Sequence, residues 1–376
     1  AAYLQSVAER TVLQDPWGSD PFGFAPNRYY WASRWADYTN RSFSRLSGVV
    51  ISGNGGVPSP SVKLDTAAGT TNNVYLGVFG YNYESAGQGR LFISPGGSLA
   101  VTSNVVVGKE GQGWVQQNGG TLQINGVLRL AEQPLASGSY NLAGGTLTAS
   151  RIAAGLGSAS FSITGGHLGF ADFGTTTNTF SLLQAGGTLA PSNAATIHGD
   201  YTMGNSAILA LALGNGTNSL NVPGRTANLG GTLSLSYTPG FTPTPGQQFT
   251  LLTANAVSGR FTKIATPWPM PGGIALVLNY ISNAVFASTV NGLADSNTNG
   301  LPDWWELQYF GGLDSGQTWT NSYLGDGIAN GVKYALYLDP TVPVTADKMP
   351  QGVISNGSFI ISYRQHVGGS GLVGVD

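Results

Sequence analysis

The sharpest chemical pattern in the chain is the twelve-residue segment 295–306, which reads Asp-Ser-Asn-Thr-Asn-Gly-Leu-Pro-Asp-Trp-Trp-Glu. Its positions 1, 3, 5, 9 and 12 carry side-chain oxygens and are Asp295, Asn297, Asn299, Asp303 and Glu306. Gly300 at position 6 permits a sharp turn, and position 7 offers the carbonyl oxygen of Leu301. Because oxygen ligands in this order suit a hard divalent cation, the segment predicts a Ca²⁺ site.

The spacing is that of an EF-hand-type loop, whose last ligand lies in the first turn of the following helix. We expect this helix from about Pro302, where a missing N–H has no consequence, to Phe310, before Gly311-Gly312. A simpler interpretation is that Asp303 and Glu306 only meet the helix dipole, but it leaves the earlier ligands unexplained. Only three ligands are carboxylates, which predicts a modest affinity suited to places where calcium is plentiful.

A second, weaker copy of the loop follows in the sequence. Asp326-Gly327-Ile328-Ala329-Asn330 matches positions 5 to 9 and precedes a helix expected over 331–337. Its positions 1, 3 and 12 are Ser322, Leu324 and Lys333. Leucine has no side-chain donor and an ammonium repels a metal ion, so this half is predicted to be empty or only to support the first.

The two halves together resemble the dockerin or thrombospondin type 3 kind of calcium repeat over residues 293–341. The likeness is carried by Leu-Pro-Asp-Trp-Trp-Glu, by Asp-Gly-Ile-Ala-Asn and by the closing Leu338-Asp339-Pro340. The resemblance implies calcium binding in a secreted bacterial surface protein. In a dockerin such a pair of loops binds a cohesin partner.

Upstream of the calcium loop a glycine repeat sets the architecture. Gly-Gly-x-Leu begins at residues 96, 119, 144, 165, 186 and 230, at intervals of 23, 25, 21, 21 and 44 residues, and a looser copy begins at Gly204. Short alternating strands at this period predict an all-β fold, a right-handed parallel β-helix, with an antiparallel sandwich as the rival. Apolar residues at alternate positions are expected to point inward, namely Leu122, Ile124, Leu233 and Leu235.

Residues 90–290 resemble the end of an autotransporter-type passenger β-helix. The likeness lies in Gly186-Gly187-Thr188-Leu189-Ala190-Pro191, Gly240-Phe241-Thr242-Pro243 and Val257-Ser258-Gly259-Arg260-Phe261, taken in this order. It implies export and display at the cell surface. Because no translocator barrel follows the repeat, the chain is more similar to large secreted bacterial proteins that reuse it. A start at Ala1-Ala2 fits cleavage by a signal peptidase.

Composition narrows the function further. Charged residues are 9% of the 376, and 16 basic against 18 acidic residues give a net charge of −2, which excludes nucleic acid as an electrostatic partner. The chain has no cysteine, which excludes thiol catalysis and zinc-thiolate sites. The longest apolar stretch, 274–290, is too short and too polar to span a membrane.

The sequence divides into four predicted parts. Residues 1–46 hold nine aromatic residues in the stretch 17–43 and five arginines, and are expected to cap the β-helix, to dock on a neighbouring subunit or to bind a ligand. The β-helix is predicted over 47–290, the calcium hairpin over 291–345, and the start of a further β segment over 346–376.

The favoured function is a secreted, extracellular structural or surface-display protein. Its β-helix rod is expected to self-associate into a filament or surface layer and to be stabilised by Ca²⁺. The alternative is a carbohydrate-binding or polysaccharide-cleaving module. We expect no enzyme, because Asp172 and Asp200 are 28 residues apart, not one coil, and the three histidines, His167, His198 and His366, lie in no catalytic motif.

Overall fold

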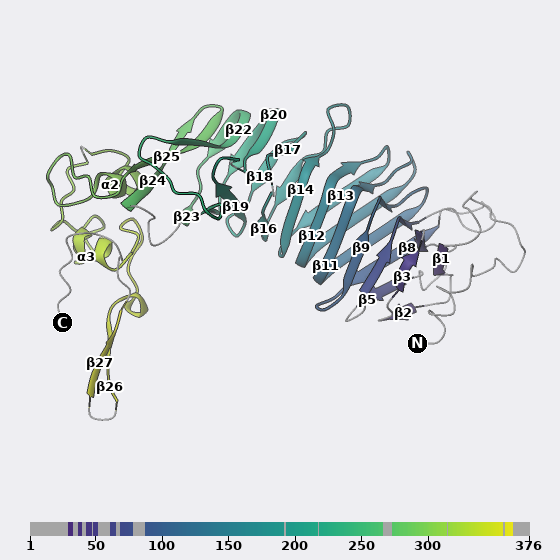
Figure 1. The fold of residues 1–376 in the computed structure, drawn as a ribbon, viewed down its shortest axis with the longest axis horizontal. Coiled ribbons are helices and arrows are strands. Elements are labelled where there is room, and N and C mark those ends of the chain that lie inside the picture. Colours follow the sequence, from purple (N-terminus) through teal and green to yellow (C-terminus); the bar gives the residue numbers. More distant parts are fainter. Residues whose placement is uncertain are drawn as a thin grey trace, which may run out of the picture.

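The computed structural model describes residues 29–32, 37–39, 43–46, 48–51, 61–64, 68–77, 87–191, 193–216, 218–265, 273–313, 315–355 and 358–363, with side chains from residue 70 onward. Most of these residues form one parallel β-solenoid, drawn as the long row of strands in Figure 1. Each coil contributes one strand to each of three columns, and every strand pairs with its equivalent in the next coil.

The first column contains β1 (Tyr29–Ala32), β4 (Gly48–Ile51), β7 (Val74–Leu76), β10 (Val105–Val107), the ends of β11 (Gln112–Leu130), β12 (Ser137–Ala154) and β14 (His167–Phe173), β17 (Ala195–Ile197), and the starts of β20 (Leu220–Leu229) and β22 (Gln248–Gly259). The second contains β2 (Asp37–Thr39), β5 (Ser61–Leu64), β8 (Gln88–Ile93), the starts of β11 and β12, β13 (Ser158–Ile163), β15 (Leu182–Gln184), β18 (Tyr201–Met203), and the ends of β20 and β22.

The third column contains β3 (Phe43–Leu46), β6 (Ala68–Thr71), β9 (Ser98–Val101), the middles of β11 and β12, the start of β14, β16 (Thr188–Leu189), β19 (Ile208–Leu213), β21 (Thr232–Tyr237) and β23 (Lys263–Ala265). All these pairings are parallel, so the predicted parallel solenoid is confirmed and the antiparallel sandwich is wrong. The right-handed sense of winding stays a prediction.

A continuous row of leucines fills the third column. One leucine from each coil aligns with the next, and every one is at most 2% exposed: Leu99, Leu122, Leu147, Leu168, Leu189, Leu209 and Leu233. Burying each side chain contributes about 1.5–3 kcal/mol, so the row is a main part of the core. The looser copy at Gly204 is thus a true coil, because it supplies Leu209. Ile124 and Leu235 also point inward, as predicted.

Glycine is required at the turn before this column for a geometric reason. Gly145 has φ +76, and a Cβ there would lie 2.3 Å from the carbonyl carbon of Gly119 in the preceding coil. A side chain is excluded by both the left-handed backbone and the close approach of the coils. The Gly-Gly of the repeat therefore sets how tightly successive coils stack.

An antiparallel hairpin ends the stack. β24 (Ile274–Ile281) pairs with β25 (Ala284–Asn291), and β25 pairs antiparallel with β22. Beyond it come α2 (Asp303–Tyr309), α3 (Asn330–Ala335), η2 (Ala346–Lys348) and a separate hairpin of β26 (Gln351–Ser355) and β27 (Ser358–Ser362). Figure 1 shows the two α-helices at the β24 end of the rod and the last hairpin projecting away from it.

The four predicted domain boundaries stay predictions, with one observation to add. β1, β2 and β3 lie within the predicted cap of residues 1–46 and pair in parallel with β4, β5 and β6 of the stack. The remaining residues of that segment and its aromatic and arginine side chains lie outside the described residues. In the described part of the chain, none of the helices has the length and apolar character that crossing a membrane requires.

Candidate metal centre

An aromatic core fixes the helical segment against the end of the solenoid. Trp304 and Trp305 of α2 and Tyr334 of α3 are buried together, and they pack against Ala275 and Val277 on β24. The ring of Tyr334 lies edge-on to Trp305, with centroids 6.0 Å apart. The two loops that precede these helices are thereby held next to each other, although their central residues are more than thirty positions apart in sequence.

The first loop folds as the sequence predicts. α2 begins after Pro302 and ends before Gly311, which has φ +78. Within the loop, the carboxylate of Asp295 accepts hydrogen bonds from the backbone N–H groups of Asn299 (3.1 Å) and Gly300 (3.0 Å). Gly300 takes φ +88, so position 6 makes the sharp turn that only glycine adopts easily.

Glu306 lies at the centre of this loop. Its side chain is fully buried, and Oε1 accepts a 2.7 Å hydrogen bond from Nδ2 of Asn299. Nδ2 of Asn297 lies 3.4 Å from both oxygens of Glu306. Three of the predicted ligands, at positions 3, 5 and 12, are therefore in mutual contact.

The other predicted ligands lie around this centre. Asp303 accepts hydrogen bonds from the N–H (2.7 Å) and the hydroxyl (2.6 Å) of Ser296, which orients its carboxylate toward the loop. The N–H of Leu301 donates to Oδ1 of Asn299 at 2.8 Å, while its side chain is buried in the aromatic core. The Leu301 prediction concerns the carbonyl oxygen, and the burial of the side chain fixes that peptide in place.

The charges around Glu306 favour a cation. Burial raises the pKa of this carboxyl above its usual value, hydrogen bonds from Asn299 and Asn297 lower it, and the negative charges of Asp303 and Asp295 raise it further. Three carboxyl groups thus share one small volume, and a divalent cation would relieve both their repulsion and the cost of burial. Among the described residues no group of three or more His, Cys, Asp and Glu has the arrangement of a metal site, so the donor set depends on the two asparagines and a backbone carbonyl as well.

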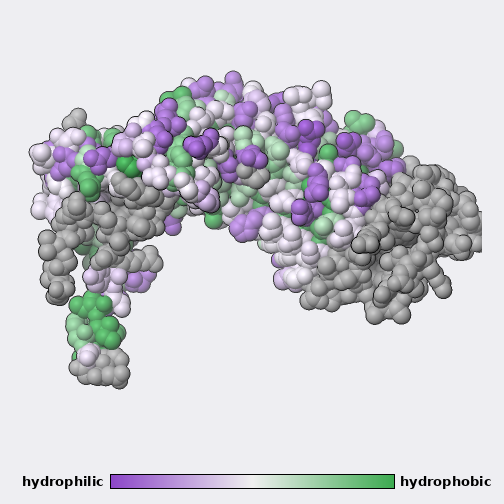
Figure 2. Space-filling model, viewed as in Figure 1, coloured by the Kyte–Doolittle hydropathy of each residue, from purple (hydrophilic) through white to green (hydrophobic). Residues whose placement is uncertain are grey.

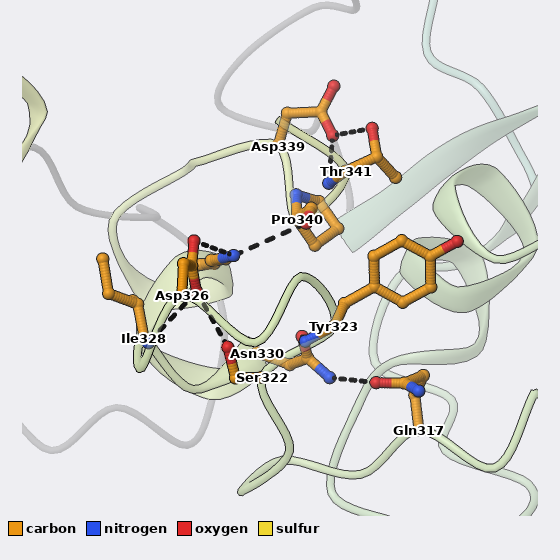
Figure 3. Close-up of polar contacts among 10 residues, drawn as sticks. Gln317, Ser322, Tyr323, Asp326, Ile328, Asn330, Asp339, Pro340 and Thr341 are labelled. Carbon is orange, nitrogen blue, oxygen red and sulfur yellow. Dashed lines mark hydrogen bonds and ion pairs between the residues drawn. The ribbon is translucent and has the colours of Figure 1, made fainter. Parts of the chain in front are cut away.

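The second loop contains a different arrangement, drawn in Figure 3. Lys333 is fully buried, and its Nζ lies 2.7 Å from Oδ2 of Asp326. Oδ1 of Asp326 accepts hydrogen bonds from Ser322 Oγ (2.8 Å) and from the N–H of Ile328 (3.2 Å). The hydrogen bond from Lys333, above all, lowers the pKa of Asp326 to about 2.

Trp319 connects the two loops through its backbone. Its N–H donates to the carbonyl of Asn299 at 3.1 Å, and its own carbonyl accepts from the N–H of Gly331 at 2.9 Å. A Cβ on Gly331 would lie 2.1 Å from the Trp319 ring, so the indole packs directly on the start of α3. The loops form one unit, as the resemblance to a paired repeat implies.

The sequence analysis missed a charged cluster on the solenoid surface. Arg151 Nη2 lies 2.9 Å from Oδ2 of Asp172, and His198 Nε2 lies 3.5 Å from Oδ1 of the same carboxylate. These residues come from successive coils, since Arg151 pairs in register with Asp172 and Asp172 with Thr196. The signal was available, because Arg151 and Asp172 are 21 residues apart, which is the repeat interval at that point.

No protein-family model matches the chain, and no curated protein matches it at a significant level. The description of the site therefore stands on its own residues and geometry.

Proposed function

We propose that the protein is a secreted structural or surface-display protein whose solenoid is a rod and whose first C-terminal loop binds one Ca²⁺. The observation that carries the proposal is the pairing of an apolar, solidly filled stack with a loop that gathers acidic and amide side chains around buried Glu306. The stack offers shape and stiffness, and the chemistry is concentrated in the loop.

The donor set of the loop fits calcium better than other common ions. Asp295, Asn297, Asn299, Asp303 and Glu306 would supply side-chain oxygens, and Leu301 its carbonyl, in the order of an EF-hand-type loop. The described contacts include no sulfur or imidazole group among these donors, which disfavours zinc and copper. Bound calcium would neutralise the acidic cluster and hold α2 against β24.

Self-association has its support in the last hairpin. Both strands of β26–β27 expose apolar side chains: Val353 (54%), Ile354 (80%), Phe359 (68%), Ile360 (46%) and Ile361 (53%). Figure 2 shows this hairpin as a green, hydrophobic projection. A lone two-stranded hairpin is marginally stable in water and has two open edges, so a second copy of the chain that adds strands would stabilise it. The low net charge opposes this association only weakly.

The test combines calcium titration with measurement of the assembly state of the full chain. Calorimetry is expected to detect one Ca²⁺ per chain, and light scattering in calcium is expected to detect oligomers or filaments. Phe359→Lys should disperse these species, whereas Leu135→Lys, at a 95% exposed position on a solenoid loop, should leave them intact. Monomers at every concentration would refute self-association, and a flat titration would refute the calcium site.

One observation favours the carbohydrate-binding alternative. On the outer face of the second column, the guanidinium of Arg90 lies 5.1 Å from the ring centroid of Trp114, which is half-buried. Next to it, Nδ2 of Asn141 donates to Oε1 of Gln116 at 2.9 Å. Aromatic and amide groups on a flat face can bind sugars. Retention on a glycan array that is lost in Trp114→Ala would establish this function instead.

A further inference from the structure

The starting observation is a lysine in a place where lysine is costly. Lys333 is fully buried, although an ammonium group loses its hydration on burial and needs a charged partner. It stands at position 12 of the second loop, where an EF-hand-type loop carries the glutamate that binds the metal. Its partner, Asp326, stands at position 5 of the same loop.

The two loops make the same contact with opposite polarity. In the first, the amide of Asn299 at position 5 donates to the carboxylate of Glu306 at position 12 over 2.7 Å. In the second, the ammonium of Lys333 at position 12 donates to the carboxylate of Asp326 at position 5, also over 2.7 Å. The positive charge in the second loop is therefore supplied by the chain.

The surroundings of the ammonium complete the arrangement. Nζ of Lys333 also lies 3.5 Å from the carbonyl oxygen of Pro340, so it faces a carboxylate and a backbone oxygen, which are ligand types that calcium uses. Asn330 at position 9 is turned away, since its Nδ2 donates to Oε1 of Gln317 at 3.0 Å and to the Thr318 carbonyl at 3.1 Å. The ligands that a metal would need are thus used by the ammonium or by neighbouring strands of chain.

We propose that the ammonium of Lys333 takes the place of the second metal ion, so that the paired loops bind one calcium ion and the second loop folds without metal. The number of bound ions rests on the proposed function of the first loop. The metal-independence of the second loop does not rest on it, because the ion pair needs no added ion.

The ion pair is tested in chelator with the full chain. Asp326→Asn leaves a buried ammonium unpaired and is expected to lower the folding equilibrium constant of this segment on the order of 100-fold. Lys333→Met should cost less, because the Asp326 side chain is 20% exposed and can reach water. The double variant should recover much of the loss. Asp347→Asn, in the exposed pair with Lys348, is the matched control and should have almost no effect.

A coupling of zero between the two substitutions would overturn the proposal. If a single variant fails to fold, hydrogen exchange of the unmodified chain in chelator decides the question instead. The amide protons of Ile328 and Asn330, which donate to Asp326 Oδ1 and to the Asn321 carbonyl, should stay protected. Rapid exchange that calcium suppresses would show that the second loop needs metal.

The stoichiometry is tested by equilibrium dialysis with Ca²⁺. The unmodified chain should bind one ion, Glu306→Gln none, and the combined Leu324→Asp and Lys333→Glu variant two, because it restores acids at positions 3 and 12. Two ions bound by the unmodified chain, or one retained by Glu306→Gln, would refute the proposal. If the unmodified chain binds none, the calcium function fails, and the experiments in chelator still decide the role of Lys333.

Discussion

The hydroxyl of Tyr201 donates a 2.7 Å hydrogen bond to Oε1 of Gln184, which lies one coil earlier in the sealed interior of the solenoid. The same arrangement occurs between Tyr140 and Gln117, whose Nε2 donates to the carbonyl of Thr146 in the following coil, as Nε2 of Gln184 donates to that of Ile208. Each glutamine thus bonds two successive coils, and no other alignment of the coils would satisfy it.

Removing one partner of this bond should destabilise the solenoid. Gln184→Leu leaves the buried hydroxyl of Tyr201 without an acceptor, which is expected to cost about 1–3 kcal/mol. The double variant Gln184→Leu, Tyr201→Phe should recover most of the loss, because both polar groups are then gone. Urea unfolding measures the effect. Equal destabilisation by the single and double variants would contradict this account.

The buried tyrosines predict a loss of stability at alkaline pH. Burial raises the pKa of Tyr201 and raises that of Tyr237 to about 12, from a usual value near 10. The unfolded state therefore loses its protons first, so stability is full below pH 10 and falls as the pH rises from about 10 toward 12. Unfolding midpoints measured between pH 8 and 12 should fall less steeply in Tyr237→Phe than in the unmodified chain.

Calcium should stabilise the C-terminal unit through Glu306. At a calcium concentration of 100 times Kd, the free energy of unfolding is expected to rise by about 2.7 kcal/mol. Glu306→Gln should abolish the rise, which tryptophan fluorescence can follow because Trp304 and Trp305 lie in this core. Glu132→Gln, which removes a surface ion pair with Arg129 on the solenoid, is the control and should respond to calcium normally. An unchanged response in Glu306→Gln would contradict the assignment.

Two glycines separate backbone strain from collision between coils. Gly145 (φ +76) and Gly240 (φ +79) have nearly the same conformation, but only at Gly145 would a Cβ meet the preceding coil. Gly240→Ala should cost about 1–2 kcal/mol, the usual penalty of the left-handed region. Gly145→Ala should cost distinctly more, because the coils must also separate. Thermal unfolding of both variants checks this, and similar costs would mean that the stack yields easily.

Much of the architecture could be predicted because it depends on local, repeated patterns. The Gly-Gly-x-Leu interval predicted the parallel coils and the inward direction of Leu122 and Leu233, both of which the structure confirms. The ligand spacing of 295–306 likewise predicted a loop followed by a helix, and the structure brings Asn297 and Asn299 to Glu306. Calcium itself stays a proposal.

Contacts between coils could not be predicted in the same way. The leucines of the third column are 20 to 25 residues apart, so the partner of a given side chain depends on the length of each individual coil. This is why the pair of Arg151 and Asp172 and the bond between Tyr201 and Gln184 were not foreseen.

The sequence by itself determined the repeat, the direction of the core residues and the order of candidate ligands, because each is written in the spacing of neighbouring residues. Lys333 shows what only the tertiary structure decided. From sequence its ammonium was a charge that repels a metal, whereas in the folded chain it is buried 2.7 Å from the carboxylate of Asp326. Burial and partner depend on how the loop closes on α3, and these, more than residue type, determine whether a charge repels an ion or replaces it.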